Sequence, residues 1–333
     1  MKAAYIEHTG PAETIVVGDL LDPEPGPGEV LVRVGYASIN PINLYIRSGA
    51  VAMPMAFPYV VGSDLSGTVV KLGAGASRYR IGQRVWGSNQ GLLGRQGTCS
   101  ELASVHEDWL HPTPDNVSDR DAAAMSLVGI TAHLGLFQFG QLKPGETVYV
   151  TGGSGGVGSM VIQMAKAFGA RVATSAGHED RLHLCRDLGA DLALNYRSDD
   201  IPAKLREFAP EGIDVWFESR RDPDLEVSIP LLRPRGRMIV IAGRAAKPIL
   251  PLGSFYTRSC SLHGFAMFNC SPEEQRATSE DINRWASEGK LRAIIGREFA
   301  LAQTAEAEAF LESCTMQGTE SLKGKVVVRV GEA

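Results

Sequence analysis

The pattern of apolar and polar positions divides the chain into two parts of different texture. Up to about residue 118, short runs rich in β-branched and apolar residues, such as EVLVRVGYASI, GTVVKLG and RVWG, alternate with proline–glycine clusters such as DPEPGPGE. Short apolar runs separated by turn residues are typical of β structure. We therefore expect an irregular, barrel-like and mostly β unit at the start of the chain.

After the turn at Pro144-Gly145, apolar strand patterns and amphipathic helical patterns alternate. The strand candidates are TVYVTG, ARVATS, ADLALN, IDVWFES and GRMIVIAG, and the helical patterns GSMVIQMAKAFG and EDRLHLCRDLG separate the first three. Continuous apolar strands joined by helices predict a parallel sheet covered on both faces. Residues 123–258 are therefore predicted to form a doubly wound α/β domain.

Capping signals predict two further helices. Ser118 and Asp121 form a capping-box pattern ahead of AAAMSLVGITAHLGLFQFG, which should end near Gly140. Ser271 and Glu274 form a second one ahead of a later helix. The final apolar run, GKVVVRV, is expected to return to the first unit. The predicted domains are therefore residues 1–122, then 123–258, with 259–333 completing the first.

Length and charge narrow the class of protein. The 333 residues exceed the roughly 250–300 at which one hydrophobic core stops growing, which favours two domains. The net charge of −5 provides no basic field for nucleic acid or anionic lipid. The opening MKAAYIEHTG lacks the apolar core of a signal peptide, and no run approaches 18 apolar residues. We expect a cytoplasmic protein without nucleic-acid or membrane partners.

A glycine-rich loop supplies the most specific motif. In VYVTGGSGGVGSMVIQ, Gly153, Gly155 and Gly158 have the G-x-G-x-x-G spacing directly between a strand and a helix. Such glycines allow a tight turn, close approach of the backbone to a pyrophosphate, and close packing of helix on strand. A glycine turn without a ligand is the less favoured alternative. The predicted dinucleotide contacts here are Gly153, Ser154, Gly155, Gly156, Val157 and Gly158.

The end of the second strand bears on the choice of nicotinamide cofactor. An acid at this position binds the ribose 2′-hydroxyl and repels a 2′-phosphate. Here the strand ends with small neutral residues, including Ser175, and Arg181 follows. Glu179 and Asp180 are contrary evidence, but they come later, where acids commonly face a helix N-terminus. Tyr196, after the third strand, is a further candidate for the adenosine phosphate, and NADPH is favoured over NADH.

Several motifs together resemble one family. PGPGEVLVRV, INPINLYIRSG, GSDLSGTVVKLGAG, TCSELASV, GITAHLGL, LKPGETVYVTGGSGGVG and LRPRGRMIVIAG are similar to those of the zinc-independent, zeta-crystallin-like quinone oxidoreductases of the medium-chain dehydrogenase/reductase superfamily. The resemblance covers over 300 residues. It implies a Rossmann domain beside a discontinuous GroES-like barrel domain, bound NADPH with Gly243 among its contacts, and a homodimer formed through the edge strand around CSLHGFAMF.

The same resemblance bears on metal binding. Zinc alcohol dehydrogenases of this superfamily carry a cysteine where this chain has Asn40, and Gly-His-Glu where it has Gly62-Ser63-Asp64. Amides and serine hydroxyls are not usual zinc ligands. The structural four-cysteine lobe is absent, since only Cys99 lies in that region, and the five cysteines form no C-x-x-C pair. We expect no metal and reduced thiols, with Asp64 either a pocket carboxylate or a turn former.

Without zinc to polarise the carbonyl, an unactivated ketone is hard to reduce, and a conjugated compound accepts hydride more easily. Asn40, Asn43, Tyr45 and Arg47 are candidate donors to the oxygen that gains charge. Asn40 and Tyr45 match pocket positions of the family, although Tyr45 also suits a core position. The predicted catalytic residues are Asn40, Tyr45 and Asp64.

For several other positions the sequence is compatible with more than one role. By resemblance Thr131 lies beside the nicotinamide, although an ordinary helix-interior threonine is equally compatible, and His133 suits packing or the surface better than a base. Cys314 stands where relatives often have an arginine for the 2′-phosphate, which weakens the NADPH prediction. Arg220 and Arg221 replace a glycine-rich run of many relatives and could alter the cofactor entrance.

The favoured function is NADPH-dependent reduction of quinones or α,β-unsaturated carbonyl compounds. A 2-enoyl thioester or alkenal reductase on the same scaffold is the nearest alternative. A non-catalytic NADPH-binding protein, as in the crystallin members of the family, is the alternative from another class.

Overall fold

The computed structural model describes residues 1–331, which form two compact units. Unit 1 consists of Met1–Leu127, Ser271–Ser287 and Arg292–Ala333, and unit 2 of Val128–Cys270 and Glu288–Leu291. Unit 1 is therefore discontinuous in sequence. Residues 123–127 lie with unit 1 and residues 259–270 with unit 2, so the compact units differ from the predicted boundaries after residues 122 and 258.

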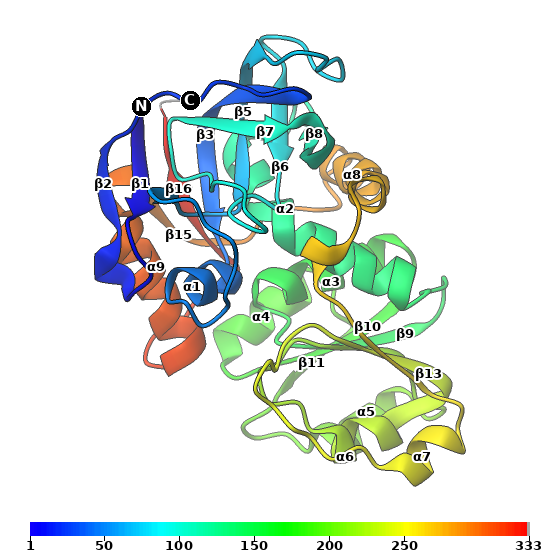
Figure 1. Ribbon diagram of the computed structural model, residues 1–333. Helices are drawn as coiled ribbons and strands as arrows, with labels where there is room; N and C mark the ends of the chain where they lie inside the picture. Colours follow the sequence, from blue (N-terminus) through cyan, green and yellow to red (C-terminus); the bar gives the residue numbers. More distant parts are fainter. Residues whose placement is uncertain (332–333) are drawn as a thin grey trace. The chain divides into compact units, whose positions relative to one another are not determined.

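Unit 1 is built from two sheets (Figure 1). The larger follows the order β15-β16-β3-β5-β6-β8, with β7 paired to β3, and only β15 and β16 are parallel. The smaller follows the order β2-β1-β4. The strands are β1 (Lys2–Ile6), β2 (Val16–Asp19), β3 (Glu29–Ile39), β4 (Tyr59–Val60), β5 (Asp64–Leu72), β6 (Arg84–Gly87), β7 (Leu102–His106), β8 (Leu110–Pro112), β15 (Ile295–Ala300) and β16 (Lys325–Arg329).

The core of unit 1 comes from the apolar runs that predicted strands. Val30, Val32 and Val34 alternate along β3 and pack with Leu65 and Val69 of β5. Alternate residues of a strand face the same side of the sheet, so one β3 face is buried here. The helices of this unit are α1 (Pro41–Arg47), α8 (Pro272–Ser287), α9 (Thr304–Glu312), η1 (Ala12–Thr14), η2 (Glu107–Trp109), η6 (Leu301–Gln303) and η7 (Ser313–Gln317), while η5 (Met267–Asn269) belongs to unit 2.

Unit 2 contains a six-stranded sheet in the order β11-β10-β9-β12-β13-β14, and every neighbouring pair is parallel. This is the doubly wound order 3-2-1-4-5-6. The predicted α/β architecture is confirmed. The strands are β9 (Thr147–Thr151), β10 (Arg171–Ala176), β11 (Leu192–Asn195), β12 (Ile213–Glu218), β13 (Leu232–Val240) and β14 (Ser261–Gly264).

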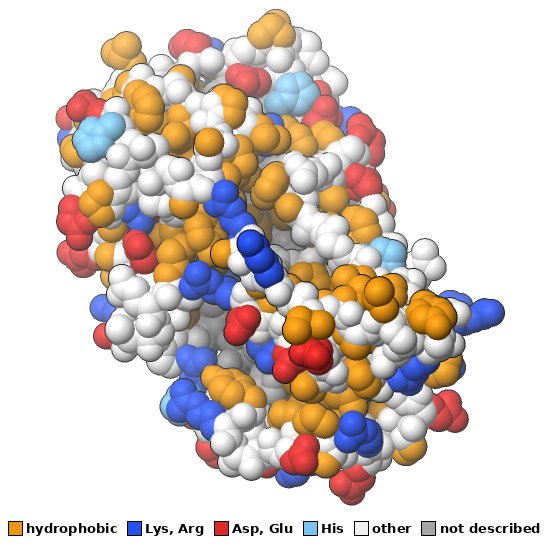
Figure 2. Space-filling view, turned by 60° about the horizontal axis from the view of Figure 1, so that its bottom comes forward, with side chains coloured by type: hydrophobic (Ala, Val, Ile, Leu, Met, Phe, Trp, Pro, Cys, Tyr) orange, Lys and Arg blue, Asp and Glu red, His pale blue; other side chains and the backbone are white. Residues whose placement is uncertain are grey.

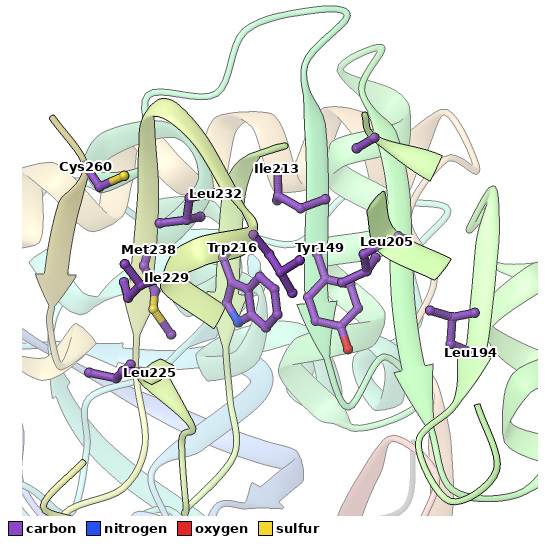
Figure 3. Close-up of a cluster of buried hydrophobic side chains, with 13 residues drawn as sticks. Tyr149, Leu194, Leu205, Ile213, Trp216, Leu225, Ile229, Leu232, Met238 and Cys260 are labelled. Atoms are coloured by element: carbon purple, nitrogen blue, oxygen red, sulfur yellow. The ribbon is translucent and has the colours of Figure 1, made fainter. Parts of the chain in front are cut away.

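Helices connect these strands, and one face of the sheet carries a large apolar cluster (Figure 3). Tyr149 and Trp216 lie at its centre with ring centroids 4.4 Å apart, flanked by Ile213, Leu232 and Met238. The helical elements are α3 (Gly156–Ala167), α4 (Glu179–Asp187), α5 (Ile201–Phe208), α6 (Leu225–Ser228), η4 (Ile229–Leu231) and α7 (Leu252–Tyr256).

A continuous helix runs from unit 1 into unit 2. It comprises α2 (Asp119–His133) and η3 (Leu134–Phe139) and ends at Gly140, as the sequence predicts. Ser118 accepts from the backbone N–H of Asp121 at 3.1 Å, which confirms the cap. Among residues 1–331, Asp119–Phe139 is the one helix long and apolar enough to span a membrane, but 78% of its most apolar window is buried, as in a core helix.

The surface view in Figure 2 shows basic and acidic side chains interspersed among broad uncharged and apolar areas. The basic groups on this face do not merge into one large field. This agrees with the net charge of −5.

Candidate active site

A buried polar cluster in unit 1 surrounds Asp64, the first residue of β5. Ser38 donates to its Oδ2 at 2.6 Å and Ser88 donates to its Oδ1 at 2.6 Å. The Asn40 amide donates to Oδ2 at 2.8 Å, and the Asp64 side chain is 0% exposed. Asp64 is therefore a hydrogen-bonding carboxylate and not a turn residue. We call Ser38, Asn40, Ser63, Asp64, Ser88 and Lys325 the Asp64 cluster.

The Asn40 side chain has partners on every side within this cluster. Its Nδ2 donates to Asp64 Oδ2 and, at 3.1 Å, to Ser63 Oγ. Its Oδ1 accepts from Lys325 Nζ at 2.5 Å. An amide nitrogen carries two hydrogens, so both are already directed at protein oxygens. An acceptor oxygen would have to displace Ser63 or Asp64 before Asn40 could donate to it.

Lys325, at the start of β16, is the member of the cluster that the sequence analysis missed. Its Nζ also donates to the carbonyl of Ile39 at 2.9 Å and lies 3.8 Å from Asp64 Oδ2. Burial lowers the pKa of Lys325 to about 8, and the negative charge of Asp64 opposes that shift. The GKVVVRV pattern predicts the strand but carries no signal that its lysine points inward. The pairing of β16 with β3 places it there.

Helix α1 presents the remaining predicted donors. Asn43 Oδ1 accepts from the Asn40 backbone N–H at 2.8 Å, and its buried Nδ2 has no hydrogen-bond partner among the described residues. Tyr45 is half-buried, and its phenol makes no hydrogen bond to any of residues 1–331. Tyr45 is thus a donor that an acceptor oxygen could use without breaking an existing bond.

Arg47 proves to be a structural residue and not a free donor. Its Nε donates to Glu308 at 2.6 Å, its Nη2 to Glu312 at 2.7 Å, and its Nη1 to the carbonyl of Gly10 at 2.7 Å. The Arg47 side chain is 1% exposed. The guanidinium therefore ties α1 to α9, and the prediction that Arg47 is a substrate donor was wrong.

In unit 2, the glycine loop joins β9 to α3 with very little space. A Cβ atom at Gly153 would lie 2.2 Å from Thr174 Oγ1, and one at Gly158 would lie 2.3 Å from the carbonyl oxygen of Gly152. Gly152 has a φ of +69°, which favours glycine. Side chains at 153 and 158 would push the helix away from the strand.

The start of α3 is the part of the loop left open. Ser154 is buried, whereas Gly155, Gly156 and Val157 are partly exposed. The first N–H groups of a helix have no acceptor within the helix, and they carry its positive partial charge. The Gly155 N–H donates to the Gly152 carbonyl at 3.0 Å, so Gly156 and Val157 are the residues that offer backbone donors to an anion. Gly155 and Gly156 carry no Cβ and leave room for the anion to approach.

The end of β10 is arranged differently from the expectation for Ser175. Its side chain is buried, and its Oγ accepts from the Tyr149 hydroxyl at 2.8 Å on the face that carries the apolar cluster. Tyr196, 55% exposed, covers Gly177, where an added Cβ would lie 2.4 Å from the phenol oxygen. Arg181 is part-exposed in the first turn of α4. Tyr196 and Arg181 are therefore more accessible than Ser175 among the candidate phosphate contacts.

A second charged cluster lies after β12. Glu218 is 0% exposed and accepts from Arg220 Nε at 3.0 Å, from Thr151 Oγ1 at 2.7 Å and from Trp216 Nε1 at 3.2 Å. Partial burial acts to lower the pKa of Arg220, but its hydrogen bonds to Glu218, together with the nearby negative charges of Glu218 and Asp224, raise it overall. The sequence marked Arg220 only as a departure from relatives.

The other predicted positions lie in unit 2. Thr131 is buried in α2, and Gly243 follows β13 with a φ of +89°. The His133 ring packs on Phe137 with centroids 4.6 Å apart, in agreement with a packing role. All five cysteines are free thiols, and residues 1–331 hold no group of three or more His, Cys, Asp or Glu side chains placed for a metal.

Comparisons with known proteins agree with this two-part construction. The family model described as alcohol dehydrogenase GroES-like domain matches residues 26–115, and the one described as zinc-binding dehydrogenase matches residues 156–284. Quinone oxidoreductase from Rattus norvegicus is 30% identical over 309 residues, which cover 92% of each chain. The chain belongs to the quinone oxidoreductase family. It is an oxidoreductase of the medium-chain dehydrogenase/reductase superfamily, as the sequence motifs predicted.

Solved structures of this superfamily share the fold along nearly the whole chain. An NAD-dependent alcohol dehydrogenase is 30% identical with a TM-score of 0.87, covering 99% of this chain and 100% of its own. A mycobacterial protein solved as a complex with NADPH is 26% identical with a TM-score of 0.84, at the same coverage. Solved structures that share this fold therefore include proteins described with either nicotinamide cofactor.

Proposed function

We propose that this chain reduces quinones or related α,β-unsaturated carbonyl compounds with NADPH and without a metal ion. The observation that carries the proposal is the Asp64 cluster. Where zinc enzymes of the superfamily have ligands, this chain has an amide and a hydroxyl, neither of which is a usual zinc ligand. The ammonium of Lys325, 3.8 Å from Asp64, already supplies a cation to this carboxylate.

The cofactor part of the proposal is supported by the glycine loop of unit 2. Bound NADPH would supply the hydride. The open N-terminus of α3 would hold its pyrophosphate, and the cramped positions Gly153 and Gly158 keep that helix end against the sheet. Arg181 and Tyr196 would contact the 2′-phosphate. A solved structure with the same fold is described as an NAD-dependent alcohol dehydrogenase, so the proposed preference for NADPH depends on the neutral end of β10.

The acceptor part follows from the donors that unit 1 offers. Without a Lewis acid, hydride transfer is easiest to an acceptor that spreads the new negative charge to a hydrogen-bonded oxygen. We assign the donor role to the Tyr45 phenol, because it has no partner to lose. Asn40 and Asp64 would shape and hold the pocket wall through the Asp64 cluster.

The same reasoning covers the alternatives. A 2-enoyl thioester or alkenal reductase would use the same donor, with a pocket that admits a long acyl chain. A non-catalytic NADPH-binding protein would bind the cofactor and reduce nothing.

We also propose a cytoplasmic homodimer that pairs through β14, which has one strand neighbour, β13, among residues 1–331.

The test is the exchange Tyr45→Phe, which keeps the ring and deletes the donor. Loss of one preorganised donor costs about 100-fold in enclosed sites, and about 10-fold is expected here if water can substitute. We expect the turnover number to fall by about 10-fold while NADPH affinity stays unchanged. Tyr36→Phe, a half-buried tyrosine on β3, is the matched control and should leave turnover unchanged.

The measurement is steady-state oxidation of NADPH with a panel of quinones, enones and enoyl thioesters, beside a separate titration of NADPH binding. Turnover of Tyr45→Phe within twofold of the parent would reject the donor role. Binding of NADPH without turnover of any acceptor in the parent protein would favour the non-catalytic alternative.

A further inference from the structure

The strand order of unit 2 defines where a dinucleotide should bind. From β9 the chain winds to β10 and β11 on one side, and the later strands β12 to β14 lie on the other side. Open parallel sheets bind ligands beyond the carboxyl ends of their strands, at the point where the winding reverses. In this sheet that point lies between β9 and β12, so residues directly after Thr151 and Glu218 border it.

The segment after β12 is fixed to the start of the glycine loop. Ser219 donates from its backbone N–H to Thr151 Oγ1 at 2.8 Å and from its own hydroxyl to the Thr151 carbonyl at 2.6 Å. A Cβ at Gly152 would lie 3.3 Å from Ser219 Oγ. Arg220, the next residue, therefore starts beside the loop that would hold the pyrophosphate.

The guanidinium of Arg220 is held along one edge. Its Nε and Nη2 donate to the two oxygens of Glu218 at 3.0 Å and 3.1 Å, and its backbone N–H donates to the same carboxylate at 2.9 Å. Glu218 is itself fixed by Thr151 and Trp216. A planar fork held at two points loses little further freedom when its remaining N–H groups bind an anion.

The other edge of this guanidinium is available. The Arg220 side chain is 47% exposed, and its Nη1 donates to none of residues 1–331. If the arginine served only to neutralise Glu218, the carboxylate and the guanidinium would satisfy each other, and cofactor affinity would not depend on Arg220.

We propose that Arg220 is a cofactor-binding residue that donates from Nη1 to the pyrophosphate of the nicotinamide dinucleotide, with Glu218 as its positioning residue. This inference rests on the proposed function, because it requires that unit 2 binds the cofactor. It adds a charged side chain to a site otherwise made of backbone N–H groups. Both NADPH and NADH carry the pyrophosphate, so Arg220 should contribute equally to the affinity for each of them.

The experiment measures the dissociation constants of NADPH and NADH for Arg220→Met by isothermal titration. Arg233→Met is the matched control, because Arg233 is also half-exposed and pairs with a buried acid of β12, Asp214, at the amino end of the strand and away from Glu218 at its carboxyl end. We expect about tenfold weaker binding of both cofactors for Arg220→Met, equivalent to about 1.4 kcal/mol. Their affinity ratio should stay that of the parent protein, and the control should bind as the parent does.

Two further variants separate the roles. Arg220→Lys keeps the charge without the planar fork and should recover part of the cofactor affinity lost in Arg220→Met. Glu218→Gln keeps Arg220 and should weaken the binding of both cofactors by a smaller factor than Arg220→Met does. Melting temperatures show whether each variant folds, and Arg220→Lys supplies the measurement if Arg220→Met does not.

The outcomes are distinct. Unchanged affinity in folded Arg220 variants would overturn the inference and leave the proposed function intact. A loss confined to NADPH would also overturn it, because it would assign Arg220 to the 2′-phosphate. Failure of the parent protein to bind either dinucleotide would refute the proposed function itself.

Discussion

Adding a single methyl group at different glycines of the loop should distinguish the loop's role in packing from its role in cofactor binding. A Cβ at Gly155 would lie 3.3 Å from the Gly152 carbonyl oxygen, a distance that a shift of a few tenths of an ångström relieves. A Cβ at Gly153 would lie 2.2 Å from Thr174 Oγ1 and 2.8 Å from Ile162 Cδ1. We therefore expect Gly155→Ala and Gly153→Ala to have different effects on the free energy of unfolding.

The magnitudes follow from what each methyl group meets. Overpacking a core costs about 1–3 kcal/mol, and Gly153→Ala should lie in the upper part of this range because Thr174 Oγ1 also donates to the Val150 carbonyl at 2.8 Å. Gly155→Ala should change stability by less than about 1 kcal/mol, since alanine also restricts the unfolded chain. Its methyl group would nevertheless stand where the backbone must approach the pyrophosphate, so NADPH affinity should fall by about tenfold or more.

The assay is chemical unfolding of both variants in the absence of cofactor, beside titration of NADPH. The double variant Gly153→Ala/Thr174→Ala supplies the check, because removal of Oγ1 should recover part of the lost stability. Full stability of Gly153→Ala would refute the packing argument. Unchanged NADPH affinity of Gly155→Ala would refute the assignment of this loop to the pyrophosphate.

Two further predictions concern the cofactor and the metal. Arg181→Gln should raise the Michaelis constant for NADPH about tenfold, the loss of a charge-assisted bond of about 1.5 kcal/mol, and leave that for NADH unchanged. Arg186→Gln on the same helix, where Arg186 pairs with Glu179, is its control, and equal kinetics of the parent with both cofactors would contradict the NADPH preference. Purified protein should contain no stoichiometric zinc and keep its activity after chelation. Elemental analysis that finds about one tightly held zinc per chain would overturn this.

Local patterns in the sequence were sufficient for most of the elements. The apolar runs predicted β9 to β13, and the Ser118 cap and Gly140 set the two ends of the long helix, because these signals depend on neighbours in the chain. Strand β14 was expected only from the family resemblance, as the edge strand around CSLHGFAMF, and not from its own pattern. Its four residues, SLHG, alternate between partly buried and exposed, and only pairing with β13 identifies them.

The candidate site was less predictable, because its chemistry depends on contacts between distant residues. Asn40 looked like a free amide in its local sequence, and its partner Lys325 is 285 positions away. Ser175 looked suited to a phosphate until the structure showed its bond to Tyr149. Asp64 could be a turn former or a pocket carboxylate until Ser38 and Ser88 were placed beside it.

The position of Lys325 has a consequence for biosynthesis. Strand β3 and Asp64 leave the ribosome early, whereas β16, which brings the ammonium to them, follows almost 300 positions later. Until then one edge of β3 lacks its partner strand, and the Asp64 carboxylate lacks its countercharge. An unpaired strand edge and an uncompensated charge are both unfavourable when buried. Residues 128–270 of unit 2 are complete before that moment. The nascent chain can therefore assemble its parallel sheet first, and the β unit closes last, which makes truncation before Lys325 a cause of aggregation.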